Sequence, residues 1–173
     1  MLDEKIQGAF NDQINAETFS AYLYWSMSAY FESVNLGGFA GWMRAQAQEE
    51  MVHAMKFYSF IIERGGRVIL KALEAPETDW DSPLAAFQAA YKHECYISGR
   101  INDLVDMATA RKDHAANSFL QWFVNEQVEE ESSVDAVVQK LKLMADAPGG
   151  MFMLDRELGT RIFTPPPAEG EAG

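Results

Sequence analysis

The chain has 173 residues, of which 48% are hydrophobic and 23% are charged, and its formal net charge is −12 at pH 7. This composition predicts one globular domain with a substantial core, and the negative charge argues against nucleic acid or an anionic membrane as a partner. The single cysteine excludes an internal disulfide framework and any metal site built from a CxxC pair. MLDEKIQGAF has no features of a secretory signal, and no stretch approaches about 18 consecutive apolar residues, so we expect a cytoplasmic protein without a membrane span.

Four long helical patterns follow one another along the chain, and each ends at a helix-breaking sequence. They predict helices over residues 3–34, 38–64, 83–111 and 113–147. The amphipathic segment MFMLDRELGTRIF predicts a short fifth helix after them. The tail over residues 164–173, TPPPAEGEAG, has the composition of a disordered segment. We therefore assign the folded domain to residues 1–163.

The connection from Gly65 to Asp81 is far longer than the turns on either side of it. Those short turns predict two antiparallel helical hairpins. When extended, the long connection can reach about 60 Å, whereas each neighbouring helix spans about 40 Å. It can therefore run the whole length of a bundle and join two parallel helices. The predicted fold is all-α: a four-helix bundle with one long crossover and a short fifth C-terminal helix.

Each predicted helix has a seam that is apolar at both ends and polar in the middle. The polar positions are Glu17, Glu50, Glu94 and Gln127, with His53 and Glu130 one turn further along. Glu50 follows Glu17 by 33 residues, and Gln127 follows Glu94 by the same separation. Because each pair is centred on a hairpin turn, its members should lie at the same height on antiparallel helices. The two hairpins are expected to meet at one buried polar layer.

A buried layer of acids must be neutralised, because each unpaired charge costs on the order of several kcal/mol. Shared protons can do this, and metal ions do it better. Carboxylates with one imidazole and no thiolate disfavour structural zinc and suit two hard cations. The spacing of Glu50 and His53 matches the Glu-x-x-His motif of di-iron and di-manganese bundles, whereas the counterpart is Gln127 followed by Glu130. We predict a di-metal centre whose second position lacks an imidazole and holds its metal more weakly.

These residues, with the crossover and the short fifth helix, resemble the prokaryotic non-haem ferritins. The motifs that carry the resemblance are Glu17 with Tyr24, QEEMVH at 48–53, Glu94, and FLQWFVNEQVEEE at 119–131. The resemblance covers residues 1–163 and implies a ferritin-like bundle that stores iron. It also implies ferroxidase activity, in which O₂ or H₂O₂ oxidises Fe(II), and a cage of 24 subunits that encloses ferric mineral.

The resemblance also implies which seam residues hold the di-iron centre. These are Glu17, Glu50 and His53 for the first iron, and Glu94 and Glu130, with Gln127 close by, for the second. Glu50 would bridge the two ions. Tyr24 would lie at the edge of the centre, where it could donate an electron.

A third iron site is a further implication of the resemblance. The residues that match it are Glu49, Glu126, Glu129 and Glu130. The EEE run over residues 129–131 can also be interpreted as an ordinary solvated helix face.

Other interpretations stay open. Met51 lies where bacterioferritins carry a methionine that binds haem, but the second Glu-x-x-His of those proteins is missing, so we do not expect haem. A di-iron peroxidase of the rubrerythrin kind would require a four-cysteine iron centre, which one cysteine excludes. An oxidase without storage, or a non-enzymatic helical interaction module, would share the bundle. A mini-ferritin would place its ligands across a dimer interface instead.

Overall fold

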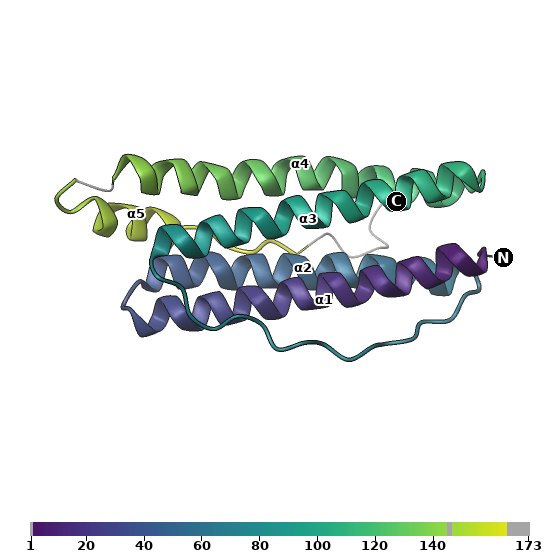
Figure 1. Cartoon of the computed structure of the whole chain (residues 1–173), viewed down its shortest axis with the longest axis horizontal. Coiled ribbons are helices and arrows are strands. Elements are labelled where there is room, and N and C mark those ends of the chain that lie inside the picture. Colours follow the sequence, from purple (N-terminus) through teal and green to yellow (C-terminus); the bar gives the residue numbers. More distant parts are fainter. Residues whose placement is uncertain (1, 145–146, 166–173) are drawn as a thin grey trace, which may run out of the picture.

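The computed structural model describes residues 2–144 and 147–165, which form helices and connecting segments without any strand. The helices are α1 (Glu4–Ser33), α2 (Gly37–Glu63), α3 (Pro83–Ala110), α4 (His114–Leu143) and α5 (Gly150–Leu158). Two antiparallel hairpins, α1–α2 and α3–α4, lie side by side, and α5 packs at one end of the bundle (Figure 1). The predicted four-helix bundle with a short fifth helix is confirmed. Most of the tail for which we predict disorder, residues 166–173, lies outside the described residues.

The ends of α1, α2 and α3 fall within one residue of the predicted bounds. The end of α4 is wrong in the prediction, because the helix stops at Leu143 rather than at residue 147. A proline disfavours helical backbone in the residue ahead of it, and Pro148 is followed by Gly149, whose φ of 77° is left-handed. The PGG sequence therefore separates α4 from α5, although α4 already ends five residues before Pro148.

Side-chain caps fix the beginnings of both helices in the second hairpin. The Ser82 hydroxyl accepts a hydrogen bond at 3.1 Å from the backbone N–H of Ala85 in the first turn of α3. The ring of Pro83 fixes a φ that suits the start of this helix. Asp113 caps α4 through the N–H of Ala116 at 3.0 Å and also accepts two hydrogen bonds from Arg64, each 3.0 Å long. The hydrogen bonds from Arg64 lower the pKa of Asp113. Arg64 ends α2, so this contact ties the two hairpins together at that end.

The first turn of α2 has no cap from its own segment, because Leu36 offers no side-chain acceptor. Asp155 on α5 takes that place: its Oδ1 accepts the N–H of Gly38 at 2.8 Å and that of Phe39 at 3.2 Å. A Cβ on Gly38 would lie 1.7 Å from the carbonyl oxygen of Asp155, so only glycine allows this approach. The amphipathic fifth helix thus packs against the start of α2.

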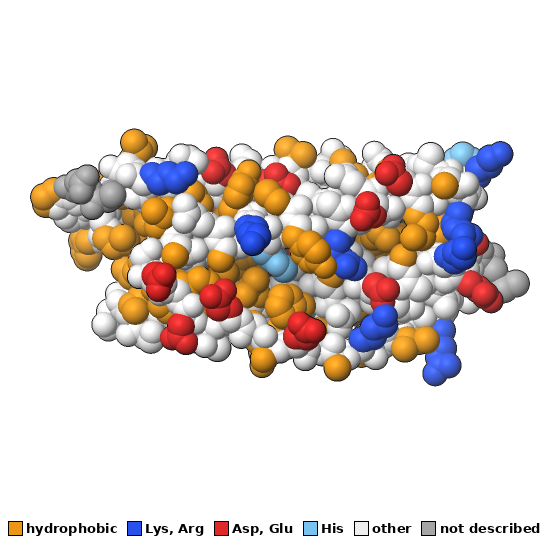
Figure 2. Space-filling model, in the orientation of Figure 1, with side chains coloured by type: hydrophobic (Ala, Val, Ile, Leu, Met, Phe, Trp, Pro, Cys, Tyr) orange, Lys and Arg blue, Asp and Glu red, His pale blue; other side chains and the backbone are white. Residues whose placement is uncertain are grey.

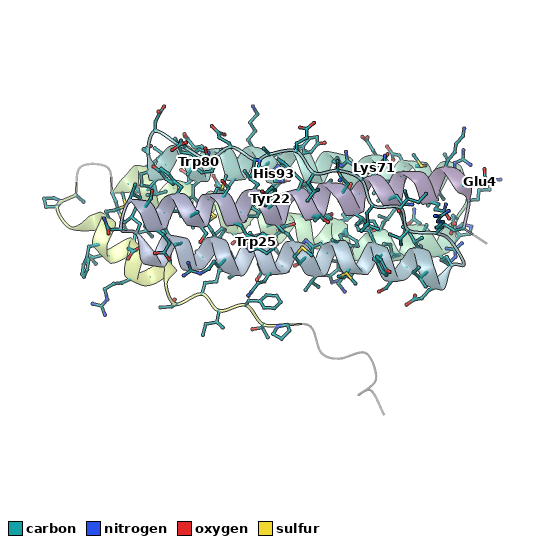
Figure 3. The ribbon with its side chains drawn as sticks, turned by 90° about the horizontal axis from the view of Figure 1, so that it is seen from below. Glu4, Tyr22, Trp25, Lys71, Trp80 and His93 are labelled. Atoms are coloured by element: carbon teal, nitrogen blue, oxygen red, sulfur yellow. The ribbon has the colours of Figure 1, made fainter. Side chains whose placement is uncertain are left out.

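The crossover from α2 to α3 lies along α1 for the length of the bundle (Figures 1 and 3). Asn11 donates from Nδ2 to the carbonyl of Arg67 at 3.1 Å and accepts from the N–H of Ile69 at 2.7 Å. Further along, the Ser26 hydroxyl donates to the carbonyl of Glu77 at 2.6 Å. Polar residues on the outer face of α1 therefore satisfy backbone groups of an otherwise irregular segment. As predicted, this segment joins two parallel helices.

Two hydrophobic clusters fill the bundle, one on each side of its middle. The cluster at the α5 end includes Tyr24, Phe31, Phe39, Phe87 and Leu154. The cluster at the other end includes Phe10, Phe57, Ile101, Leu120 and Phe123. None of the described helices is both long and apolar enough to cross a membrane. The six polar seam residues are buried between the clusters, which confirms the predicted polar layer.

Candidate metal centre

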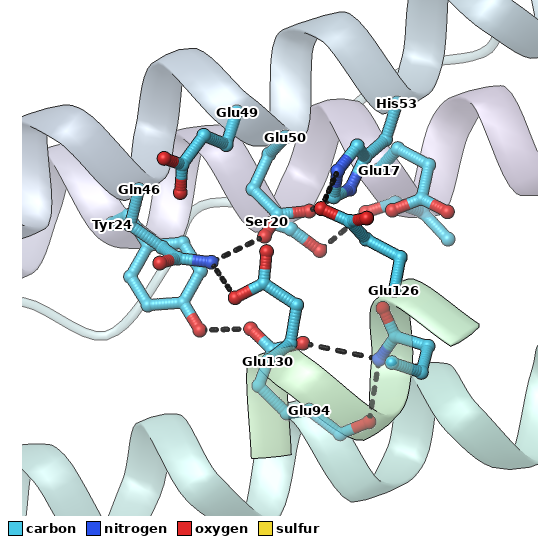
Figure 4. A network of polar contacts seen from close by, with 12 residues as sticks. Glu17, Ser20, Tyr24, Gln46, Glu49, Glu50, His53, Glu94, Glu126 and Glu130 are labelled. Atoms are coloured by element: carbon cyan, nitrogen blue, oxygen red, sulfur yellow. Dashed lines mark hydrogen bonds and ion pairs between the residues drawn. The ribbon is translucent and has the colours of Figure 1, made fainter. Parts of the chain in front are cut away.

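The first group of candidate ligands joins α1 to α2. Glu17, Glu50 and His53 each offer one ligand atom, and these atoms lie within 4.8 Å of one another (Figure 4). His53 Nδ1 lies 3.4 Å from Glu50 Oε2, and the amide of Gln13 donates to Glu17 Oε1 at 2.8 Å. The second oxygen of Glu17, Oε2, is buried without a hydrogen-bond partner among the described residues. A cation would supply the partner that this oxygen lacks.

The second group joins α2 to the other hairpin and shares Glu50 with the first. Glu50, Glu94 and Glu130 offer ligand atoms within 4.8 Å of one another. The Tyr24 hydroxyl donates to Glu94 Oε1, and the Gln127 amide donates to Glu94 Oε2 at 3.3 Å. Gln127 therefore faces Glu94 through its nitrogen and holds that carboxylate in place. Glu50 belongs to both groups and is positioned to bridge two cations.

Protons balance the buried carboxylates when no metal is bound. Burial, reinforced by the charge of Glu50, raises the pKa of Glu17 to about 8 and that of Glu130 to about 7. Burial and the nearby carboxylates also raise the pKa of Glu94 well above its usual range. Burial favours the neutral forms of Glu50 and His53 as well, but their attraction outweighs it, so the pKa of Glu50 falls and that of His53 rises well above its ordinary value. A cation must displace protons from this layer to bind.

A third group lies between α2 and α4. His53, Glu126 and Glu130 offer ligand atoms within 4.8 Å of one another, and His53 Nε2 is 3.8 Å from Glu126 Oε1. The resemblance implies a third iron site formed by Glu126 and Glu130 together with Glu49 and Glu129. The structure leaves Glu129 exposed on α4, and it pairs Glu49 with an arginine from the segment after α5. Two of the four predicted residues thus come together with His53.

Gln46 is part of the cluster although the seam pattern does not single it out. Its side chain is fully buried, and its amide donates to Glu50 Oε1 at 3.1 Å and to Glu130 Oε2 at 2.6 Å (Figure 4). Its own Oε1 is buried without a partner among the described residues. The signal that could have found Gln46 is its spacing, since it precedes Glu50 by four residues and so lies one turn away on the same face.

Polar contacts also support the first group from outside. Arg100 on α3 donates from Nε to Gln13 Oε1 at 2.9 Å, and the same glutamine donates to Glu17. Ser20, one turn from Glu17, lies 2.8 Å from His93 Nε2. Burial lowers the pKa of His93, which favours the neutral imidazole. The contacts of Arg100 and Gln13 thus orient Glu17 from outside the cluster.

The donor set fits hard metal cations. It consists of carboxylate oxygens with one imidazole, it contains no thiolate, and it leaves two buried polar atoms without partners. This cluster, in a bundle with one long crossover, places the chain in the class of helix-bundle proteins that hold metal with carboxylates. Within that class, the chain belongs to the ferritin family. The family's ferritin-like domain matches residues 7–144.

The similarity to known ferritins extends over nearly the whole chain. The bacterial non-heme ferritin of Bacteroides fragilis is 45% identical over 161 residues, which are 93% of this chain and 100% of that protein. The bacterial non-heme ferritin of Staphylococcus aureus is 37% identical over 94% of this chain and 98% of its own length. Among solved structures, an Archaeoglobus fulgidus ferritin engineered into a closed form is 53% identical, with a TM-score of 0.93 over 95% of this chain and 100% of that chain.

Proposed function

We propose that this chain stores iron and that it is a ferroxidase, which oxidises Fe(II) with O₂ or H₂O₂ before the ferric product is deposited. Membership of the ferritin family supports iron storage. The observation that carries the ferroxidase proposal is Glu50, which is common to two buried ligand groups and is positioned to bridge two Fe(II) ions. Glu17 and His53 complete the group on one side of Glu50, and Glu94 and Glu130 complete the group on the other side.

The donor set favours oxidation of bound Fe(II). Anionic oxygen ligands stabilise Fe(III) more than Fe(II), because the more highly charged ion gains more from each carboxylate. Glu17 and Glu50 supply this charge beside His53, and Glu94 and Glu130 supply it on the other side. With only three protein side chains in each group, room remains for the oxidant, which accepts the electrons. Tyr24 donates a hydrogen bond to Glu94, and we propose that it contributes a further electron.

The ligand groups contain one imidazole and no thiolate, and this shortage of nitrogen and sulfur ligands suits a centre that releases its product. The second group contains no imidazole, because Glu130 stands where the Glu-x-x-His motif has its histidine, and Gln127, in place of the motif's glutamate, donates to Glu94. Protons on Glu94 and Glu130 compete with the metal for the carboxylates. We infer that iron passes through this site, whereas an oxidase without storage would keep its metals.

An aerobic Fe(II) titration tests the proposed function. The first two to three Fe(II) ions added per chain should be oxidised in a fast phase, followed by a large soluble ferric load; absorbance follows the oxidation, and iron analysis after gel filtration measures the load. Oxidation no faster than in buffer would contradict the ferroxidase proposal. Stoichiometric retention of two irons with no further uptake would favour the oxidase without storage.

We further propose that the subunits assemble into a cage of 24 copies. Large apolar side chains that a monomer would leave in water support this assembly: Trp25, Met55, Leu70, Phe152 and Met153. Hydrophobic side chains gather at the α5 end of the face shown in Figure 2. A groove of about 290 Å³ between α1, α2 and the crossover is lined by Met55, Leu70 and their neighbours.

Charge in that groove should oppose assembly. The double variant Met55→Glu/Leu70→Glu is expected to shift sedimentation from one large species toward small oligomers, because each new carboxylate would have to be buried in an interface. The control Met55→Leu/Leu70→Met keeps the apolar volume and should sediment like the unmodified protein. A monomeric unmodified protein, or a double variant that assembles normally, would contradict this interface.

A further inference from the structure

The segment after α5 brings an arginine to the edge of the metal cluster. Residues 159–165 run back alongside α2 (Figure 1), and Arg161 donates from Nη2 to Glu49 Oε2. Its guanidinium also lies over the indole of Trp42, 4.1 Å from the ring centroid. The side chains of Arg161 and Glu49 are 22% and 26% exposed, so the pair is mostly shielded from water. Such a pair is screened less than a surface ion pair.

Glu49 lies close to the third ligand group, which is formed by His53, Glu126 and Glu130. It directly precedes Glu50 on α2 (Figure 4), and the charges of both His53 and Glu126 act on its carboxylate. A cation held by the third group would therefore have the Glu49 carboxylate as a neighbouring oxygen donor. In the structure that donor faces Arg161 instead.

We propose that Arg161 is a built-in competitor for Glu49, which weakens the hold of the third group on Fe(II) or Fe(III) and so favours its onward transfer. The inference rests on the proposed function, because it concerns iron that reaches this group. One carboxylate cannot neutralise two neighbouring cations fully. When Glu49 turns to a metal ion, the guanidinium loses its counter-charge and remains close to that ion.

The packing of Arg161 keeps the competitor in place during this exchange. The stack on Trp42 does not depend on Glu49, and the indole is itself buried. The other terminal nitrogen of Arg161, Nη1, is buried without a hydrogen-bond partner among the described residues. The guanidinium is thus positioned by packing more than by a complete set of hydrogen bonds. It can release Glu49 and take it back without moving far.

Substituting Arg161 with glutamine should strengthen binding of the third cation. We expect the third Fe(II), titrated without oxygen, to bind about tenfold more tightly in Arg161→Gln, since contacting charged groups are commonly coupled on this scale. Zn(II) provides a redox-inert probe of the same positions, measured by calorimetry. Arg156→Gln on α5 is the matched control, because Arg156 is exposed, and it should bind cations like the unmodified protein. Near-ultraviolet circular dichroism checks that the packing around Trp42 survives.

A second substitution separates competition from a general effect on folding. If Arg161 acts through Glu49, the gain in affinity disappears in Glu49→Gln/Arg161→Gln relative to Glu49→Gln alone. A gain that persists in this background would overturn the proposal. So would unchanged or weaker third-cation binding in Arg161→Gln. Failure of the unmodified protein to bind the first two Fe(II) ions would instead contradict the proposed function.

Discussion

Glu50→Gln should abolish the fast phase of Fe(II) oxidation, with an expected loss of about 100-fold or more in its rate. Glu50 is shared by the Glu17–His53 group and the Glu94–Glu130 group. Glutamine keeps the shape of the side chain but removes the negative charge and the ability to bridge two cations. Both positions should therefore lose affinity together. Stopped-flow absorbance under air measures the initial rate.

Glu63→Gln is the matched control, because it makes the same substitution at an exposed glutamate at the end of α2. It should oxidise Fe(II) like the unmodified protein. Both variants should sediment normally, since neither side chain lies in the apolar groove. A Glu50→Gln variant that retains the fast phase would show that oxidation occurs elsewhere.

The metal-free protein should lose stability as the pH rises from about 5 to about 8, and Glu17→Gln should remove the part of this loss that Glu17 contributes. The pKa of Glu17 is raised from 4.5 to about 8 in the folded chain, mainly by burial. Between these values the unfolded chain has released the proton while the folded chain keeps it, so increasing pH favours unfolding. The stabilisation is complete below the unfolded pKa and is lost as the pH passes the folded pKa. We expect the loss to be on the order of 2 to 4 kcal/mol.

Urea denaturation with a chelator present, repeated at four pH values, measures this dependence. His53, Glu94 and Glu130, whose pKa values are also raised, contribute slopes of the same sign that remain in Glu17→Gln. Glu63→Gln should follow the unmodified protein. An equal pH slope in Glu17→Gln and the unmodified protein would contradict the assignment to Glu17. Bound Zn(II) should reverse the trend, because metal ions and protons compete for the same oxygens.

The sequence predicts the bundle well because its apolar and polar residues recur at regular helical spacings. Seam spacing places apolar residues at both ends and acids in the middle, and the equal separations of Glu17 from Glu50 and of Glu94 from Gln127 predict their common height. The crossover length then leaves one arrangement of the hairpins. These features depend on helix geometry, which is uniform along the chain. The metal-binding roles of the residues stay predictions, which the variants above test.

Contacts between segments far apart in the chain are not predictable in this way. Arg161 meets Glu49 from 112 residues away, and no periodicity relates an irregular segment to a helix face. The two-sided contact of Gln46 depends on how α4 rotates against α2. The end of α4 is also not predictable in this way, because the apolar pattern continues past Leu143 and the first strong helix breaker is Pro148.

The cap that α5 provides for α2 has a consequence for synthesis on the ribosome. Gly38 emerges 117 residues before Asp155, which accepts its N–H in the finished structure. Throughout that interval the first turn of the nascent α2 has water, and no carboxylate, as its partner. A helix translated more than a hundred residues later therefore completes a helix begun in the first quarter of the chain. Premature termination before α5 would leave the early hairpin frayed at this turn.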